Sequence, residues 1–265
     1  MDDDRPELVL PSAGPRPLPL DTAVAAVLGY ARGRRPLYFR APNARTGRWV
    51  EIPAFGYERF DARPGSPDPL GEADILTAEG LHGRLDPAAW AAMKAVLDDV
   101  APLADAASDR AAGRAFPDLP DDEFSVLAEP GTVGASLREI WQHCSETPGV
   151  SVQHVSAALH HRRPSLFPLL NRTTRWQLLP HVREGDSGVE AVIHREIRAN
   201  RAAFDELRDR VAVLLAVDPP PTLLRLHDVL IWLCATLRWT HAVALGRRSE
   251  EWWTYRETHP GSQPV

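Results

Sequence analysis

The stretch PGVSVQHVSAALHHRRPSLFPLLNRTTRW, residues 148–176, carries the signals that decide the fold. It opens on a Pro-Gly-Val turn that lies between two segments with helical periodicity, residues 135–144 and 152–161. A turn of this kind exposes backbone N–H groups at the start of its second helix, where they can donate to a phosphate with the help of the helix dipole. The pattern predicts a helix-hairpin-helix over about residues 135–161, with Gly149, Val150 and Ser151 at a nucleic-acid backbone.

The same region is free of acidic residues from Thr147 to Arg183, although the whole chain has a net charge of -6. It holds five Arg and four His, which is the charge pattern of a local phosphate-binding patch. The residues expected to contact nucleic acid are Arg162, Arg163, Arg172 and Arg175, together with Gln153 beside the turn. The alternative is that these arginines pair with acidic residues on neighbouring helices, such as Glu190, Glu196, Asp205 and Glu206.

Composition limits the remaining choices. The 265 residues are 44% hydrophobic and 25% charged, as in an ordinary globular protein of one large or two small domains. The two Cys have no metal-binding spacing, and no nucleotide-binding loop or zinc signature is present. No apolar run reaches the length of a membrane span, and no signal-peptide pattern opens the chain. We therefore expect a cytoplasmic protein with no membrane partner, metal or cofactor.

Periodicity predicts a mostly α protein with a single helical domain over residues 21–245. Two alternating runs around Asn43 predict a small β hairpin at about residues 36–56. One long amphipathic helix is expected over residues 190–217, and Pro102 is expected to kink or end an earlier helix. The Pro-rich residues 1–20 predict a disordered arm, and residues 246–265 a polar tail.

The hairpin and the residues after it resemble the helix-hairpin-helix superfamily of DNA glycosylases. In that superfamily an apolar helix and a loop follow the turn, and the next apolar stretch ends in a catalytic Asp. When the two patterns are aligned without gaps, this Asp falls on Asn171, and the Lys nucleophile of bifunctional members falls on Gln153. An amide cannot carry the charge of the Asp or form a Schiff base, so the resemblance implies the fold without the excision chemistry.

A second likeness covers most of residues 55–240. The segment GVSVQHVSAALHHRRPSLFPLLN, residues 149–171, and the segment ADILTAEGL, residues 73–81, are similar to an actinobacterial family of unknown function. The resemblance implies a helix-hairpin-helix, glycosylase-like core and names no activity. The family has a second Gly where this chain has Ser151, and an Asp where it has Asn171.

Three residues of the stretch are candidates for chemistry. His160 and His161 are adjacent, so they diverge on a helix and rarely share one metal ion, but either can serve as a general base or stack on a nucleobase. Asn171 is a favoured helix cap and is equally suited to bind a substrate through its amide.

These observations lead to one expectation and two alternatives. We expect non-specific nucleic-acid binding by a DNA-binding patch beside a degenerate glycosylase-like site. The first alternative is a small-molecule enzyme, for example of specialised metabolism, with a pocket near His160 and Asn171. The second is a protein-interaction module that uses the Trp252-Trp253 pair in the tail.

Overall fold

The computed structural model describes residues 6–66 and 68–259 and is mostly helical, as predicted. The α-helices are α1 (Leu20–Arg32), α2 (Glu72–His82), α3 (Pro87–Ala111), α4 (Val133–Glu146), α5 (Val152–Arg162), α6 (Arg172–Leu178), α7 (Val189–Ala199), α8 (Arg201–Leu215), α9 (Leu223–Ala235), α10 (Trp239–Gly246) and α11 (Glu250–Thr258). The 3-10 helices are η1 (Tyr57–Arg59), η2 (Phe116–Asp118), η3 (Asp121–Phe124) and η4 (Leu179–His181). The strands are β1 (Glu7–Leu8), β2 (Leu18–Pro19), β3 (Arg34–Phe39) and β4 (Arg48–Pro53). Both pairs are antiparallel.

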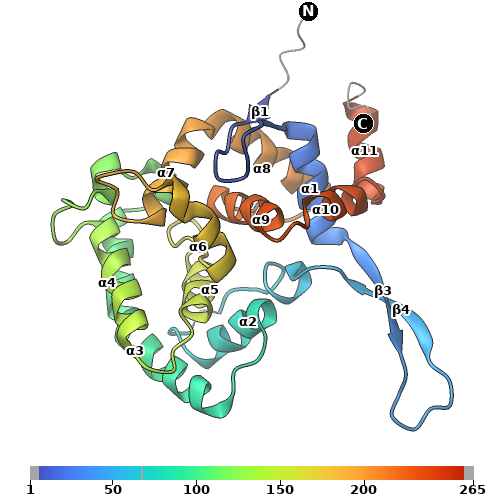
Figure 1. The fold of residues 1–265 in the computed structure, drawn as a ribbon, viewed down its shortest axis with the longest axis horizontal. Coiled ribbons are helices and arrows are strands. Elements are labelled where there is room, and N and C mark those ends of the chain that lie inside the picture. Colours follow the sequence, from blue (N-terminus) through green and yellow to red (C-terminus); the bar gives the residue numbers. More distant parts are fainter. Residues whose placement is uncertain (1–5, 67, 260–265) are drawn as a thin grey trace, which may run out of the picture.

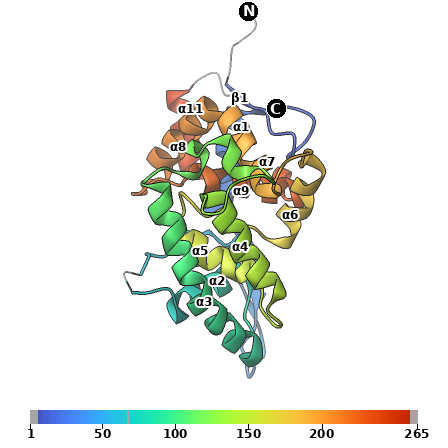
Figure 2. The same ribbon diagram turned by 90° about the vertical axis from the view of Figure 1, so that its left-hand side faces the viewer.

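The helices form two groups. Helices α2 to α5 lie together at one end of the molecule, whereas α1 and α8 to α11 lie at the other end beside β1 (Figures 1 and 2). We call them the middle group and the terminal group, because the second contains the first and last helices of the chain. The short helix η1 contacts both α1 and α2, so the chain passes between the groups at this point.

Helix α1 is the centre of the terminal group. Residues 23–31 are all buried, because α8, α9 and α10 surround the helix. The backbones of α1 and α10 cross in close contact at Gly29 and Gly246. A Cβ atom on Gly29 would overlap the carbonyl oxygen of Ala242, and one on Gly246 would overlap that of Ala25. Glycine at both positions therefore lets the two helices approach more closely than any other residue would allow.

The N-terminal segment corrects a prediction. Residues 6–19 are not a disordered arm, because β1 pairs with β2 and the side chains of Leu8 and Leu10 are fully buried. The side chain of Asn200 holds this segment in place: its Oδ1 accepts the backbone N–H of Val9 at 2.7 Å, and its Nδ2 donates to the carbonyl of Val9 at 2.8 Å. The local composition is rich in Pro, but it does not reveal a docking partner that lies about 190 residues along the chain.

The predicted long helix is also divided at Asn200, where α7 ends and α8 begins. The Asn200 amide donates to the carbonyl of Glu196 at 2.8 Å as well as to the N-terminal segment. Helix α3 runs past Pro102 as far as Ala111 without ending. In the tail, α11 buries Trp252 and Tyr255 against the terminal group, so residues 250–258 are a packed helix.

The predicted β hairpin is confirmed, with β3 and β4 in register from the Arg34–Pro53 pair to the Phe39–Arg48 pair. It projects from the body of the protein, and every residue of β3 is exposed (Figure 1). None of the helices over the described residues is long and apolar enough to cross a membrane by itself. Helices α9 and α10 pass that test only as a pair, with a bend of 119° between them.

Candidate functional site

The predicted turn joins α4 to α5, and Gly149 adopts a left-handed conformation with φ of 80°. Ser151 does not cap α5 through its side chain. Its hydroxyl lies 2.7 Å from Nδ1 of His154, whose Nε2 lies 2.9 Å from the carbonyl of Gly83. Because a carbonyl only accepts, Nε2 carries a proton, and in the neutral ring Nδ1 then accepts the Ser151 hydroxyl. The Ser151 hydroxyl is therefore used to fix the turn against the end of α2.

The two arginines at the end of α5 are held by acidic residues. Arg162 is bound by the carboxylate of Asp74 at 2.9 Å and by the carbonyl oxygens of Ser66 and Pro69. Arg163 forms an ion pair with Asp105. For these two arginines the structure shows the alternative given above, in which they pair with acidic residues. The partners Asp74 and Asp105 lie on α2 and α3, not on the later helices. The two guanidinium groups support the middle group of helices.

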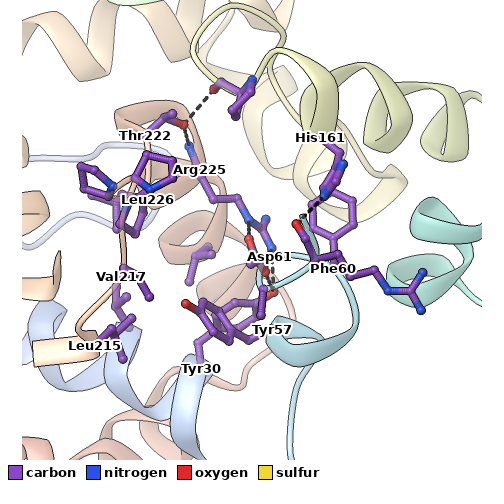
Figure 3. Close-up of a pocket in the computed structure, with 18 of the residues that line it drawn as sticks. Tyr30, Tyr57, Phe60, Asp61, His161, Leu215, Val217, Thr222, Arg225 and Leu226 are labelled. Carbon is purple, nitrogen blue, oxygen red and sulfur yellow. Dashed lines mark hydrogen bonds and ion pairs between the residues drawn. The ribbon is translucent and has the colours of Figure 1, made fainter. Parts of the chain in front are cut away.

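A buried cluster of paired charges lies on α9. The buried guanidinium of Arg225 forms ion pairs with Asp61 and Asp228 and donates to the Tyr30 hydroxyl at 2.6 Å. Tyr30 in turn donates to Asp61 at 2.8 Å, and the guanidinium carbon lies 5.4 Å from the ring centroids of Tyr30 and Phe60. Figure 3 shows Arg225 between α1 and the segment after η1. Arg225 and Tyr30 form a wall with a pocket on each side.

The first pocket, here called the aromatic pocket, has a volume of about 630 Å³. Tyr57, Phe60 and Leu226 line it, together with Pro-rich residues 217–221 (Figure 3). Asp61 and the buried Arg225, which also line it, are paired with each other. Arg32 pairs with Glu251, whereas Arg63 and Asp218 form no ion pair with a described residue. The lining of the aromatic pocket is therefore mainly apolar, and the ion pair of Asp61 and Arg225 lies at the wall.

His160 and His161 both lie at the aromatic pocket. Nδ1 of His160 lies 2.7 Å from the carbonyl of Phe167, and Nε2 of His161 lies 3.1 Å from the carbonyl of Arg63. Burial, reinforced by the charge of Arg225, lowers the pKa of His160 to about 4. A ring with this pKa is neutral at pH 7 and is a weak general base.

The second pocket, here called the amide pocket, has a volume of about 310 Å³ and is lined by Gln153, Asn171 and Arg172 among others. Asn171 caps α6: its Oδ1 accepts the backbone N–H groups of Thr173 and Thr174 at 2.9 and 3.0 Å. The capping role predicted for Asn171 is confirmed. Its Nδ2 and the whole amide of Gln153 have no partner within the described residues, so both can bind a molecule in the pocket.

Two further side chains of the amide pocket each have one buried polar atom without a hydrogen-bond partner among the described residues. Oδ1 of Asp228 and Nε2 of His82 make no hydrogen bond to any part of the chain that the structure describes. Burial raises the pKa of Asp228 to about 6, against the opposing effect of Arg225. Burial also lowers the pKa of His82 to about 4, helped by His154 and Arg225. Buried polar atoms without a partner are uncommon in folded proteins, and a catalytic role or a bound water or ion is a common explanation for them.

Three exposed arginines complete the lining of the amide pocket. Arg59 comes from η1, Arg172 from the start of α6, and Arg238 from the link between α9 and α10. None of them forms an ion pair with a described residue, and Arg238 lies 5.2 Å from the ring centroid of Trp232. Arg175 is also exposed but is not among the residues that line either pocket. The amide pocket is therefore electropositive at its exposed side.

The structure separates residues that the sequence placed together. His160 and His161 line the aromatic pocket, and Asn171 lines the amide pocket, so the expected single pocket near His160 and Asn171 is divided by the Tyr30–Arg225 wall. Sequence reasoning missed Arg59, His82, Arg225, Asp228 and Arg238. One signal was available: Arg225, His227 and Asp228 interrupt the otherwise apolar sequence of α9. Among the described residues, no group of three or more His, Cys, Asp or Glu could hold a metal ion.

Comparison with known proteins gives one result. A protein-family model described as a family of unknown function (DUF6308) matches residues 37–235, a range that includes both pockets apart from Val27, Tyr30, Arg32 and Arg238. Neither a curated protein nor a solved structure matches the chain.

Proposed function

The chain belongs to the family of unknown function DUF6308, and we propose that it binds nucleic acid without strong sequence preference, through the amide pocket and the arginines around it. The observation that carries the proposal is the contrast between the two pockets. Asp61 and the buried Arg225 at the aromatic pocket are paired with each other, whereas the amide pocket has side-chain amide groups, three arginines and one oxygen of Asp228 without ion-pair or hydrogen-bond partners among the described residues. Groups of that kind are complementary to a nucleotide.

Each part of a nucleotide has a counterpart in the amide pocket. Arg59, Arg172 and Arg238 can bind phosphate oxygens, as arginine does in many nucleic-acid complexes. The amides of Gln153 and Asn171 present hydrogen-bond donors and acceptors that match the edge of a base. Trp232 also lines the pocket and offers an aromatic face. A volume of about 310 Å³ is at the lower end for ligand pockets, which suits one nucleotide.

The proposed site is a degenerate, glycosylase-like one that binds without excising. The Oδ1 atom of Asn171 accepts the capping hydrogen bonds of α6, and the neutral amide cannot stabilise an oxocarbenium ion by charge. Gln153 cannot act as a nucleophile. The proposal therefore includes binding of the nucleic acid and excludes hydrolysis of a glycosidic bond by these two residues.

A salt titration tests the proposal. The purified protein is titrated into fluorescent duplex and single-stranded DNA at several salt concentrations, beside the triple variant Arg59→Gln, Arg172→Gln, Arg238→Gln. Each lost phosphate contact should reduce the magnitude of the slope of log affinity against log salt concentration by about 0.7 to 0.9. The slope of the triple variant should therefore be smaller in magnitude by roughly 2 to 3. Arg16→Gln is the matched control, because Arg16 is exposed and lines neither pocket. Absence of binding by the wild type at low salt would refute the proposal.

The state of Asp228 favours a second candidate, a small-molecule enzyme in the same pocket. A buried carboxyl group with a pKa of about 6 and one free oxygen can take up and release a proton near neutral pH. Thermal unfolding with a panel of free nucleotides separates the two candidates. An enzyme of this kind should be stabilised by a mononucleotide and should bind DNA weakly at every salt concentration.

A further inference from the structure

The β3–β4 hairpin carries large apolar side chains that nothing in the described structure covers. The exposed fractions of Tyr38, Phe39 and Trp49 are 52, 51 and 70%, and that of Leu37 is 39%. A two-stranded hairpin by itself is at best marginally stable in water. Contiguous exposed apolar residues commonly mark an interaction site. The hairpin is therefore a candidate contact surface.

The charge of the hairpin indicates what kind of partner it contacts. Arg35, Arg40, Arg45 and Arg48 form no ion pair within the described part of the chain. Arg34 at the base of the hairpin pairs with Glu58, and Glu51 is the only acid between residues 34 and 53. Four unpaired guanidinium groups in a protein with a net charge of -6 are a local positive feature. They are complementary to a polyanion.

The register of the strands places aromatic rings on both faces of the hairpin. Cross-strand partners lie on the same face, so Phe39 shares one face with Arg48, while Tyr38 shares the other with Trp49. The rings of Tyr38 and Trp49 contact edge to face, with 5.3 Å between their centroids. The Tyr38 hydroxyl also accepts the backbone N–H of Gly47 at 2.9 Å, which holds the turn of the hairpin.

A hairpin with rings and arginines on its surface fits a single-stranded nucleic acid better than a lipid surface or a protein groove. A membrane-bound element separates a wide apolar face from a charged face, and this hairpin does not, because both faces carry aromatic residues. Single-strand binding combines base stacking on aromatic rings with phosphate contacts from cations. The hairpin provides both kinds of group.

We propose that the β3–β4 hairpin is an arm that binds single-stranded nucleic acid, with bases stacked on Trp49 and Phe39 and phosphates held by its arginines. This inference deepens the proposed function and rests on it. The arm adds a contact outside the amide pocket, and it predicts a preference for unpaired strands, because bases in a duplex are already stacked on each other.

The test uses the full chain with fluorescent single-stranded and duplex DNA. Trp49→Ala should weaken single-strand binding by roughly 5- to 150-fold, the range known for loss of one stacking ring, and should leave the salt slope unchanged. The double variant Arg40→Gln, Arg45→Gln should instead reduce the slope by about 1.4. Trp253→Ala is the matched control, because Trp253 is exposed by 57% but lies on α11. An unchanged thermal unfolding curve shows that each variant is folded.

The outcomes separate the arm from the amide pocket. If the hairpin variants weaken binding and the triple variant of Arg59, Arg172 and Arg238 does not, the arm is supported and the proposed function of the pocket fails. If only the triple variant weakens binding, the arm is refuted. If Trp49→Ala changes the molar mass in light scattering and leaves DNA binding intact, the hairpin joins two copies of the chain, and the proposal is also refuted.

Discussion

At the scale of single residues, α9 buries two charged side chains. Arg225 and Asp228 lie within a helix whose other side chains are mainly Leu, Ile and Val. Buried charges are costly unless they are paired, and Arg225 meets this condition with two carboxylates and the Tyr30 hydroxyl. In Asp228 only one of the two carboxylate oxygens is paired with a described residue. The remaining oxygen is therefore the group whose protonation state is most sensitive to a ligand.

The raised pKa of Asp228 predicts pH-dependent binding. Burial raises this pKa to about 6, so the carboxyl group is neutral below pH 6 and negatively charged above it. A phosphate-bearing ligand in the amide pocket should therefore bind more tightly at pH 5 than at pH 8, by up to about tenfold for a difference of 1.4 kcal/mol. Affinity measured across this range should show a step near pH 6.

The variant Asp228→Asn is the control for that step. Asn keeps the shape of the side chain and cannot ionise, so the variant should bind with an affinity that is independent of pH between 5 and 8. A step that persists near pH 6 in the variant would assign the titration to another group.

At the scale of elements, the crossing of α1 and α10 depends on glycine. Gly29→Ala should lower the free energy of unfolding by about 1 to 3 kcal/mol, because the new methyl group meets a backbone carbonyl that cannot move aside easily. The loss outweighs the better helix propensity of Ala. Urea unfolding checks this, with Gly65→Ala as the control, since a Cβ there meets no atom within 4 Å. Equal stabilities of the two variants would contradict the close crossing.

Elements were predictable where their signal is local. Asp before Pro is a local signal for the start of a helix, and Asp86 accepts the backbone N–H groups of Ala88 and Ala89 at the start of α3. The β hairpin follows from alternation around Asn43. The break at Asn200 was not predictable, because the apolar period continues across it and the cause is a contact with Val9. Side chains that bind distant backbone leave no periodic trace in the sequence.

The candidate site was predictable only in part for the same reason. Gln153 and Asn171 were identified because they lie close together in one stretch with a known spacing. Arg59, His82 and Arg238 reach the amide pocket from three other segments, and each looks like an ordinary surface or helix-end residue in its own context. Only the fold reveals that these residues share a cavity.

At the scale of the whole molecule, hydrogen bonds to Glu196 connect three segments that are distant in the sequence. Its carboxylate accepts the backbone N–H of Ser12 at 2.8 Å, the Ser12 hydroxyl at 2.6 Å and Nε2 of His227 at 2.8 Å. Burial would raise the pKa of Glu196, but the hydrogen bonds from His227 and Ser12 outweigh it and lower the pKa. The N-terminal segment, α7 and α9 thus depend on one negative charge.

The lowered pKa predicts acid sensitivity. A carboxyl group whose pKa is depressed by folding stabilises the protein above its ordinary pKa, and that contribution is lost as the pH falls through the folded value. Unfolding in urea at pH 7 and at pH 4 and below should therefore show a loss of stability with acid. Glu196→Gln should cost about 3 to 5 kcal/mol at pH 7 and should show a smaller loss with acid than the wild type. Ser12→Ala, which keeps the carboxylate, should cost about 1 to 3 kcal/mol.

The packing of α1 against α10 also limits the order in which parts of the protein can fold during translation. Gly29 and Ala242 meet in space, yet almost the whole chain separates them, so α1 leaves the ribosome long before the helix that covers it. The middle group makes contacts between helices near in sequence, such as α3 with α4, and can form first. The apolar surface of α1 stays uncovered until the last helices have been synthesised, so it is prone to aggregation in the nascent chain.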